Sequence, residues 1–398
     1  MKNISIIGGG PAALILASYI DTSKYSVTIY EKKKAVGRKF LVAGEGGLNL
    51  TFNEPLDDLI KKYSPNKFME PFLRNFTNDD LRKWFKTLDI PTFLGSSNRV
   101  FPTKDLKPID VLNKMVNHLV DRGIKFEFDK TWIGWTKSDD LTFEDKTEVK
   151  TDITVFAMGG ASWKVTGSDG FWANAFESKK IKVVPFKAAN SAFGVEWDKN
   201  FINTHAGKPL KNIEVNFKRQ KSKGELVITK FGLEGNAIYA LSEKIQKAIA
   251  KGENVLLGLD LKPTMTKTQL KAKYKKSKLT KVTDILKEDL KLDRSAVGLL
   301  KHFTDKETFM NPDLLVGAIK SIPMIVTGVD EIDKAISTLG GIAGSALDDD
   351  LQIKKIPNSY AIGEMVDWYA PTGGYLLQGS FSMGFTLAEH LNKLEKQK

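Results

Sequence analysis

The stretch that decides the fold is residues 1–20, MKNISIIGGGPAALILASYI. The apolar residues Ile4, Ile6 and Ile7 predict a short buried strand, three glycines interrupt it, and the small and apolar residues 12–20 predict a helix. Two structures produce such a run: a tight turn that serves packing alone, or a turn whose backbone comes close to a pyrophosphate. The rest of the sequence distinguishes between them.

Gly8, Gly10 and Ala13 fit the dinucleotide-binding pattern G-x-G-x-x-A. The first glycine permits the turn, the second leaves room for the pyrophosphate, and the small third residue lets helix and strand pack closely. The next predicted strand, residues 25–31, ends at Glu31, near the expected spacing of about 20 residues, where a carboxylate can accept hydrogen bonds from the ribose hydroxyls. The motif follows a strand and precedes a helix, and Glu31 lies at the end of the next strand, so we predict dinucleotide binding.

Composition excludes several other classes of site. The chain has 398 residues, which predicts two or three domains. It has no cysteine, which excludes disulfides, thiolate metal sites and iron–sulfur clusters. Its four histidines are far apart in sequence, so we expect no metal site. No stretch is apolar for long enough to span a bilayer, and we expect a cytoplasmic protein without a membrane span.

The net charge of +12 is compatible with an anionic partner such as nucleic acid. However, the lysines are spread along the chain, and the densest run, residues 267–281, contains a single aromatic residue, too few for a platform on which bases stack. We therefore expect a solvated, lysine-rich surface rather than nucleic-acid binding.

The order of predicted elements indicates a discontinuous domain. Residues 1–187 alternate strands and helices, residues 188–262 are rich in short strands, residues 263–323 are mostly helical, and residues 324–398 return through the insertion to a strand, a loop and a long helix. Among the helix boundaries, we predict Asn78 as an N-cap, Gly123 as a C-terminal stop, and Thr266 with Gln269 as a capping box.

Glu31 would repel a 2′-phosphate, so NADP is disfavoured at this site, and NAD and FAD remain. Three later features favour FAD: a Gly-Arg pair at residues 37–38, a strand that leads into Gly159, and a late strand that ends at Gly363 and Glu364. In FAD enzymes of the glutathione-reductase type, such a late pair meets the ribityl and pyrophosphate part of the cofactor.

At these residues the chain resembles the BaiN/RdsA-type family of NAD(P)/FAD-dependent oxidoreductases. The resemblance covers nearly the whole chain and rests on eight stretches in order, IIGGGPAAL, GRKFLVAGEGGLNLT, NRVFPTKDLKPIDVL, AMGGASW, TGSDGFW, ITKFGLEGNAI, LGGI and GEMVDWYAPTGGYLLQGSFSMG. It implies an α/β fold: a discontinuous glutathione-reductase-type FAD-binding Rossmann domain with an inserted β-barrel-like domain and a small helical subdomain. Many members have Arg-Cys-Asn where this chain has Gly47, Leu48 and Asn49, which places it with the subgroup that carries GGLNLT.

The resemblance also implies which residues form the site, although it gives no catalytic residue beyond the flavin. The implied FAD contacts are Gly8, Gly10, Pro11, Ala12, Glu31, Lys32, Arg38, Lys39, Asn49, Trp132, Gly159, Gly363, Glu364, Asp367, Gly374 and Tyr375. Three residues are candidates for substrate contact, Arg99 through a carboxylate or a phosphate and Trp368 and Tyr369 beside the flavin face.

The predicted function is that of an FAD-dependent oxidoreductase that passes a hydride between flavin N5 and a small molecule. NADH or NADPH is the expected electron donor and would bind transiently, because the chain has no second GxGxxG motif. The alternatives are an oxygen-using amine or aminoketone oxidase, a non-catalytic FAD-binding sensor, and a flavin-dependent RNA-modifying enzyme. The absence of cysteine counts against the last, because family members of that kind rely on cysteines.

Overall fold

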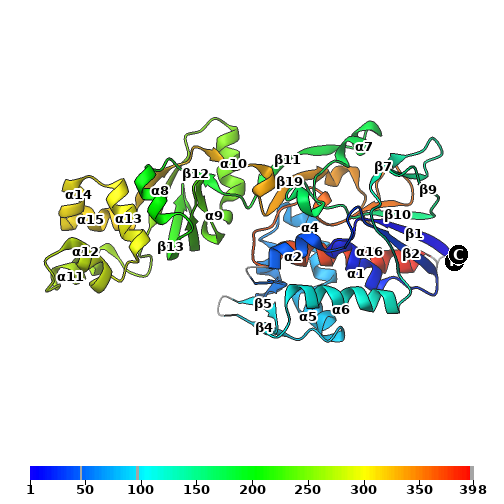
Figure 1. Ribbon diagram of the computed structural model, residues 1–398, viewed down its shortest axis with the longest axis horizontal. Coiled ribbons are helices and arrows are strands. Elements are labelled where there is room, and N and C mark those ends of the chain that lie inside the picture. Colours follow the sequence, from blue (N-terminus) through cyan, green and yellow to red (C-terminus); the bar gives the residue numbers. More distant parts are fainter. Residues whose placement is uncertain (45–46, 96–97, 395–398) are drawn as a thin grey trace. The chain divides into compact units, whose positions relative to one another are not determined.

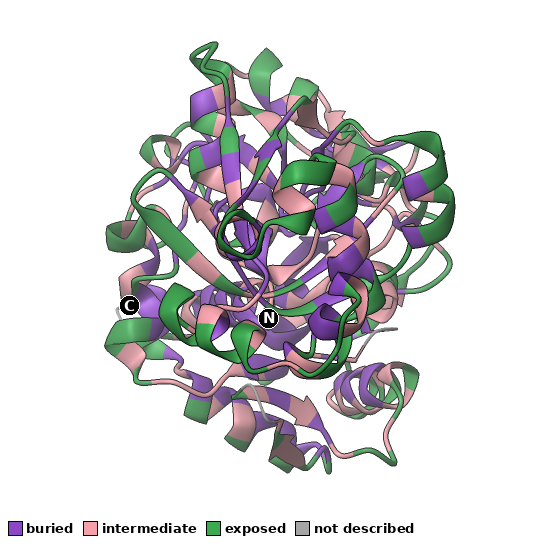
Figure 2. Cartoon of the chain, turned by 90° about the vertical axis from the view of Figure 1, so that its left-hand side faces the viewer, coloured by how far each residue is buried: buried purple, intermediate pink, exposed green. Residues whose placement is uncertain are grey.

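The computed structural model of the protein describes residues 1–44, 47–95 and 98–394. The chain forms two compact units: the first contains Met1–Ala188 and Ile332–Lys398, and the second contains Ala189–Glu331. Each unit has its own hydrophobic core. Figure 1 follows the chain from blue to red, and Figure 2 shows that the buried residues lie mainly along strands and on the inner sides of helices.

A parallel sheet of five strands forms the centre of the first unit, in the order β20-β10-β1-β2-β6. Its strands are β1 (Lys2–Ile7), β2 (Tyr25–Tyr30), β6 (Lys125–Glu127), β10 (Ile153–Phe156) and β20 (Ser359–Ala361). In the middle of the sheet, Ile6 of β1 pairs with Ile29 of β2 and Val155 of β10, and all three side chains are fully buried. The pairing of β20 with β10 brings a strand from the end of the chain beside strands from its beginning.

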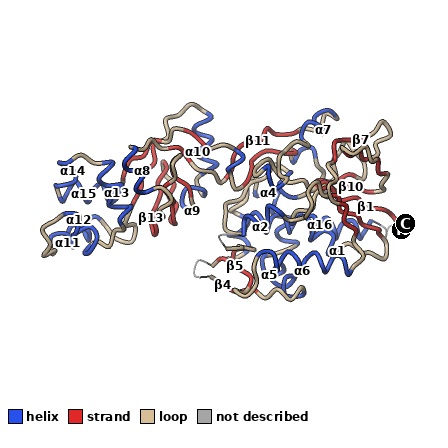
Figure 3. The backbone as a smooth tube through the Cα atoms, in the orientation of Figure 1, coloured by secondary structure: helices blue, strands red, loops and turns tan. Residues whose placement is uncertain are grey.

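Helices α1 (Pro11–Tyr19) and α16 (Tyr375–Leu394) lie side by side, as Figures 1 and 3 show. Residues 12–18 of α1 are all buried, which explains why this helix has no polar face. Gly384 of α16 permits the close contact, because a Cβ at this position would lie 2.3 Å from the carbonyl oxygen of Ala12. The first and last helices of the unit are thus packed backbone to backbone.

The remaining elements of the first unit are short. Its other helices are α2 (Arg38–Gly44), α3 (Leu56–Ile60), α4 (Asn66–Asn75), α5 (Asn78–Thr87), α6 (Pro108–Asp121) and α7 (Ala173–Ser178). Two antiparallel sheets contain β3 (Thr51–Phe52), β5 (Arg99–Pro102) and β4 (Thr92–Leu94), and β7 (Trp132–Trp135), β8 (Leu141–Phe143) and β9 (Glu148–Val149). A further pair joins β11 (Val183–Ala189) to β19 (Ser337–Ile342). Short 3-10 turns occur at η1 (Lys164–Thr166), η3 (Ile332–Lys334), η4 (Gly344–Ala346) and η5 (Gly363–Met365).

The N-cap predicted for α5 is wrong by one residue. Thr77 caps the helix in a capping box with Asp80, in which the Thr77 hydroxyl accepts from the Asp80 N–H and the Asp80 carboxylate accepts from the Thr77 N–H, both at 3.2 Å. Asn78 is the first helical residue, and its amide donates to the carbonyl oxygens of Phe52 and Glu54. The C-terminal stop of α6 is confirmed, since Gly123 follows that helix with φ of +80°.

The second unit is built on a seven-stranded sheet with antiparallel neighbours, in the order β17-β16-β13-β14-β15-β12-β18. The strands are β12 (Phe193–Gly194), β13 (Pro209–Phe217), β14 (Gln220–Ile228), β15 (Gly232–Glu234), β16 (Leu256–Asp260), β17 (Ile322–Ile325) and β18 (Gly328–Val329). The helices are α8 (Lys199–His205), α9 (Asn236–Tyr239), α10 (Ser242–Ala250), α11 (Lys267–Lys275), α12 (Val282–Asp284), α13 (Arg294–Phe303), α14 (Lys306–Met310) and α15 (Pro312–Lys320), with a π-helical turn at η2 (Ile285–Asp289). The predicted capping box of Thr266 and Gln269 is confirmed at the start of α11.

No helix in the described part of the chain is long and apolar enough to cross a membrane. The described residues also contain no group of three or more histidine, aspartate or glutamate side chains placed to hold a metal ion.

Candidate functional site

A cavity of about 610 Å³ lies entirely within the first unit. Its walls come from the turn after β1, the ends of β2 and β10, the start of α2, the turn η5 after β20, and the start of α16. In open α/β sheets, ligands bind outside the carboxyl ends of the parallel strands, which is where these segments meet. The volume falls within the range of about 300–1,000 Å³ that is typical of cofactor and ligand pockets.

The glycines of the first turn have different tasks. A Cβ on Gly8 would lie 2.5 Å from the carbonyl oxygen of Ala157, and its φ is +99°, so this glycine is required by the protein itself. A Cβ on Gly10 would meet only that same oxygen, at 4.0 Å, and would otherwise project into open space. The protein alone therefore does not require glycine at position 10, whereas a group bound close to this backbone would.

The start of α1 offers free donors at the cavity wall. Gly10 is the N-cap and provides no side chain, and the first helical hydrogen bond runs from Leu14 N–H to the Gly10 carbonyl at 3.0 Å. The N–H groups of Ala12 and Ala13 therefore have no partner within the helix, and Pro11 has no N–H. Together with the positive end of the helix dipole, such N–H groups favour a phosphate.

Glu31 is fixed against this turn by two backbone donors. Its Oε2 accepts from the Gly9 N–H and its Oε1 from the Lys33 N–H, both at 2.9 Å. Burial raises the pKa of the Glu31 carboxyl above its usual value, and the two hydrogen bonds oppose that effect. Each oxygen keeps a lone pair, so the carboxylate can still accept from hydroxyl groups of a ligand.

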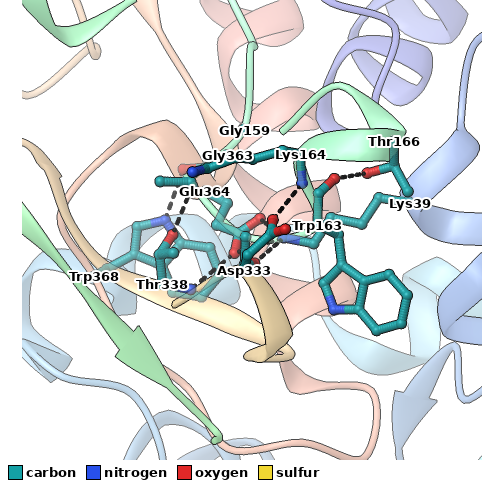
Figure 4. Close-up of polar contacts among 12 residues, drawn as sticks. Lys39, Gly159, Trp163, Lys164, Thr166, Asp333, Thr338, Gly363, Glu364 and Trp368 are labelled. Carbon is teal, nitrogen blue, oxygen red and sulfur yellow. Dashed lines mark hydrogen bonds and ion pairs between the residues drawn. The ribbon is translucent and has the colours of Figure 1, made fainter. Parts of the chain in front are cut away.

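Two of the charged residues predicted to meet the cofactor, Lys39 and Glu364, are paired with each other (Figure 4). Lys39 donates to both oxygens of Glu364, at 3.0 and 3.2 Å, and to the Ser162 hydroxyl at 2.8 Å. The Glu364 carboxylate also accepts from the Thr338 N–H at 3.1 Å. A carboxylate near a pyrophosphate would be repulsive, and here the Lys39 ammonium compensates its charge.

Two further basic residues border the cavity. Lys32 forms an ion pair with Asp169 at 2.7 Å. Arg38 is exposed, lines the cavity, and makes no side-chain hydrogen bond or ion pair with the described residues. Arg38 is therefore the freer of the two cations for an anionic ligand.

Most of the predicted cofactor residues come together in the cavity wall, namely Gly8, Gly10, Pro11, Ala12, Glu31, Lys32, Arg38, Lys39, Asn49, Trp132, Gly159, Gly363, Glu364 and Gly374. Among the described lining residues, Asp367 and Tyr375 are absent. Asp367 instead accepts from the Gly340 N–H at 3.1 Å, and Tyr375 donates its hydroxyl to Glu54 at 2.6 Å. Contact of these two residues with the cofactor stays a prediction.

The three predicted substrate residues also lie outside the described lining of this cavity. Trp368 is buried, and its indole N–H donates to the Gly363 carbonyl at 2.9 Å. Tyr369 is buried and pairs through its backbone with Ser64. Trp368 belongs to the hydrophobic core of the first unit, and Arg99 lies beside Gly373, which lines the cavity. Contact of these three residues with a substrate stays a prediction.

Residue-by-residue prediction missed the segment after β10 as a wall of the cavity. Trp163, Thr166, Ser168, Asp169 and Trp172 all line it. Asp333 of η3 fixes this segment through the N–H groups of Trp163 and Lys164, at 3.2 and 2.7 Å (Figure 4). The stretch TGSDGFW carried the signal, because small residues between two glycines are typical of a loop that follows a ligand closely.

Unsatisfied polar atoms provide a test of whether a polar cofactor fits. Among the described residues, eleven buried side-chain polar atoms have no hydrogen-bond partner, and three of them, Asn49 Oδ1, Trp132 Nε1 and Ser168 Oγ, belong to residues that line the cavity. Buried polar atoms are normally paired, so these three are available to a polar ligand in the cavity. The open space at Gly10, the free N–H groups of α1 and the carboxylate of Glu31 fit a dinucleotide in the same way.

Comparisons with known proteins agree with this geometry. The family model of the HI0933-like protein Rossmann domain matches residues 2–390. A 3-dehydro-bile acid delta(4,6)-reductase from Clostridium scindens is 22% identical, over 97% of this chain and 98% of the relative. A ribosomal RNA dihydrouridine synthase from Escherichia coli is 23% identical, over 97% of each chain.

Among solved structures, a flavocytochrome c3 fumarate reductase matches 98% of this chain and 78% of its own, with a TM-score of 0.49 and 12% identity. This likeness is too distant to carry an argument about the site. The family match over nearly the whole length is decisive: the chain belongs to the HI0933-like protein family and is an FAD-dependent oxidoreductase.

Proposed function

We propose that this protein is an NAD(P)H-dependent reductase that reduces a carbon–carbon double bond conjugated to a carbonyl group in a small molecule. The observation that carries the proposal is the cavity of the first unit, in which the turn at residues 8–12 and the start of α16 line one space. The turn at residues 8–12 offers N–H donors for the pyrophosphate of FAD. The start of α16 offers N–H donors for the part of the flavin that becomes negative on reduction.

The names of two relatives support the type of reaction. One is a delta(4,6)-reductase of a 3-dehydro-bile acid, and the other makes dihydrouridine in ribosomal RNA. In both named reactions the double bond that is reduced is conjugated to a carbonyl group. The carbonyl belongs to a steroid ring in the bile acid and to a pyrimidine ring in uridine. Relatives with such different substrates share the reduction of a conjugated double bond, so we transfer this reaction type, and not a substrate, to this chain.

When bound, the flavin would supply a hydride to the β-carbon of the double bond, and a proton would complete the reduction at the α-carbon. The chain's own residues would bind and orient the cofactor. The N–H groups of Ala12 and Ala13 would hold the pyrophosphate, and Glu31 would accept from the ribose hydroxyls.

At the other end of the cavity, α16 supplies donors of its own. Its first helical hydrogen bond runs from Gln378 N–H to the Gly374 carbonyl at 2.9 Å. The N–H groups of Leu376 and Leu377, two residues of the cavity lining, therefore have no helical partner. They would stabilise negative charge on the reduced cofactor, and so favour reduction of the flavin by NADH or NADPH.

The test is the visible spectrum of the purified protein under anaerobic conditions, before and after addition of NADPH and then NADH. We expect a bound flavin that is bleached by at least one of them and is reoxidised by a conjugated enone such as cyclohexenone. A flavin that neither nucleotide reduces would contradict the proposal. Reduction by an amine, with peroxide formed in air, would instead identify the oxidase, and a flavin inert to every donor would identify a sensor.

Reduction of uridine in RNA is a second candidate. Relatives from Escherichia coli and Haemophilus influenzae are named ribosomal RNA dihydrouridine synthases, and the second unit carries the larger part of the chain's net charge of +12. Binding of ribosomal RNA fragments at several salt concentrations, followed by analysis for dihydrouridine after incubation with NADPH, distinguishes the two candidates. Tight binding with product formation would favour RNA over the small molecule.

A further inference from the structure

The guanidinium of Arg99 lies beside Gly373 of the cavity wall and has no hydrogen-bond or ion-pair partner among the described residues. Arg99 belongs to β5, and a Cβ on Gly373 would lie 3.4 Å from its Nε and 3.9 Å from its Nη2. Gly373 lines the cavity, with φ of +104°. Among the described residues, no hydrogen bond or ion pair engages the Arg99 side chain.

The nearby carboxylate is already engaged. Glu54 accepts from the Tyr375 hydroxyl at 2.6 Å, and the Tyr375 ring stacks on Phe52, with centroids 5.2 Å apart. Phe52 is the cross-strand partner of Arg99 in the β3–β5 pair, so their side chains lie on the same face of this small sheet. Burial and the hydrogen bond to Glu54 raise the pKa of Tyr375 well above its usual range, and the positive charge of Arg99 opposes this.

The orientation of the guanidinium defines what it can bind. The Nε and Nη2 atoms form the edge of the guanidinium that offers two parallel N–H donors, a geometry that matches a carboxylate. This edge faces the position where a side chain at residue 373 would begin. Because residue 373 is glycine, no Cβ occupies that position. Arg99 is partly buried, so an ion pair there would be less screened than one on the open surface.

We propose that Arg99 is a specificity-determining residue that binds a carboxylate of the substrate through its Nε and Nη2 edge, beside Gly373. The inference rests on the proposed function, since the carboxylate would belong to the molecule that is reduced. It narrows the substrate class to carboxylic acids that carry a conjugated double bond. An alternative occupant of this edge, a phosphate of the cofactor, is an outcome of the test below.

The test uses the FAD-loaded protein and two probes of the same shape, benzoate and neutral benzamide. Their dissociation constants are measured from the flavin difference spectrum and, independently, by equilibrium dialysis of the radiolabelled probe. In the variant Arg99→Gln we expect benzoate to bind about 10- to 100-fold more weakly, the range for loss of a charge-assisted hydrogen-bonded pair, and benzamide binding to stay unchanged. Arg99→Lys keeps the charge but not the paired donors, and is expected to fall between wild type and Arg99→Gln.

Arg82→Gln is the matched control, because it removes the same charge from α5 beside the same small sheet, where Arg82 donates to Thr92 at 3.3 Å. It should bind both probes as wild type does. Equal benzoate affinity in wild type and Arg99→Gln, or no benzoate binding in wild type, would overturn the inference. Loss of FAD affinity in Arg99→Gln with unchanged benzoate binding would assign the edge to a cofactor phosphate instead.

Reduction of the flavin by NADPH and by NADH is recorded for the same samples. If neither nucleotide reduces the flavin while benzoate binding depends on Arg99, the proposed reductase function is wrong and the carboxylate site stands. If NADPH reduces the flavin normally in all variants while benzoate binding is insensitive to Arg99, the carboxylate site is wrong and the reductase function stands.

Discussion

Gly10 in the first unit and Gly232 in the second show how differently the two units use the same residue type. A Cβ on Gly232 would lie 1.9 Å from the Phe193 carbonyl oxygen, because β15 and β12 pair directly at this position. A Cβ on Gly10 would have its nearest protein atom at 4.0 Å. One glycine is therefore required by packing within a sheet, and the other is not required by the protein's own packing. The presence of a glycine alone does not reveal a binding site, but the space in front of it does.

The largest effect on folding is expected for Gly232→Ala. The new methyl group overlaps the backbone of the neighbouring strand, which cannot move without breaking the sheet, so we expect a loss of about 3 kcal/mol in the free energy of unfolding. Urea denaturation measures it. FAD affinity of the remaining folded protein should be unchanged, because Gly232 belongs to the second unit and the described cavity to the first. A Gly232→Ala variant as stable as wild type would show that packing of the sheet does not require glycine at this position.

Gly10→Ala is expected to give the opposite pattern. Its methyl group projects into the cavity, so the free energy of unfolding of the apoprotein should stay within about 0.5 kcal/mol of wild type. The dissociation constant of FAD should rise by about two orders of magnitude, equivalent to ~3 kcal/mol. Titration of the apoprotein with FAD, followed by quenching of flavin fluorescence, measures it. Wild-type FAD affinity in this variant would show that the turn serves packing alone.

Glu31→Gln is expected to have a smaller effect on FAD affinity than Gly10→Ala. A neutral amide keeps the acceptor for the Gly9 N–H but weakens acceptance from the ribose hydroxyls, so we expect FAD to bind about tenfold more weakly. Because burial raises the pKa of Glu31, the folded apoprotein holds this proton more tightly than the unfolded chain does. The resulting stability is present below the unfolded pKa and is lost as the pH rises through the folded pKa.

Comparison of wild type and Glu31→Gln therefore needs unfolding curves of the apoprotein from about pH 4 upward, through the region just above the usual pKa of a glutamate. The wild-type apoprotein should lose stability across this region relative to the variant. Parallel curves for the two proteins would mean that the Glu31 carboxyl ionises as freely in the folded state as in the unfolded chain.

The sequence predicted best those structural features that depend on residues close together in the chain. The first strand, its glycine turn and α1 follow from residues 1–20, and the capping box of Thr266 with Gln269 follows from a spacing of three residues. Even locally, competition between adjacent candidates produced an error. Asn78 and Thr77 both suit an N-cap, and Thr77 prevails because the Asn78 amide is drawn to the carbonyl oxygens of Phe52 and Glu54, more than twenty residues away.

The aromatic residues near the end of the chain show where sequence reasoning stops. Trp368 and Tyr369 are candidates for the flavin face from the sequence, and their contact with a substrate stays a prediction. The structure buries Trp368 against Tyr63 and pairs Tyr369 with Ser64, two contacts that depend on where residues 63–64 lie in the folded unit. No local pattern encodes such distant partners.

By itself, therefore, the sequence determined the strand, glycine turn and helix at the start of the chain and the carboxylate of Glu31 at the end of the next strand, because hydrogen bonding and turn geometry act over short stretches. Tertiary structure decided which distant segments complete the wall. Pairing of β20 with β10, next to β1, places η5 beside the first turn, so that Lys39 reaches Glu364 across more than 300 residues of sequence. The order of these strands depends on the burial of apolar faces over the whole unit, which no short stretch of sequence specifies.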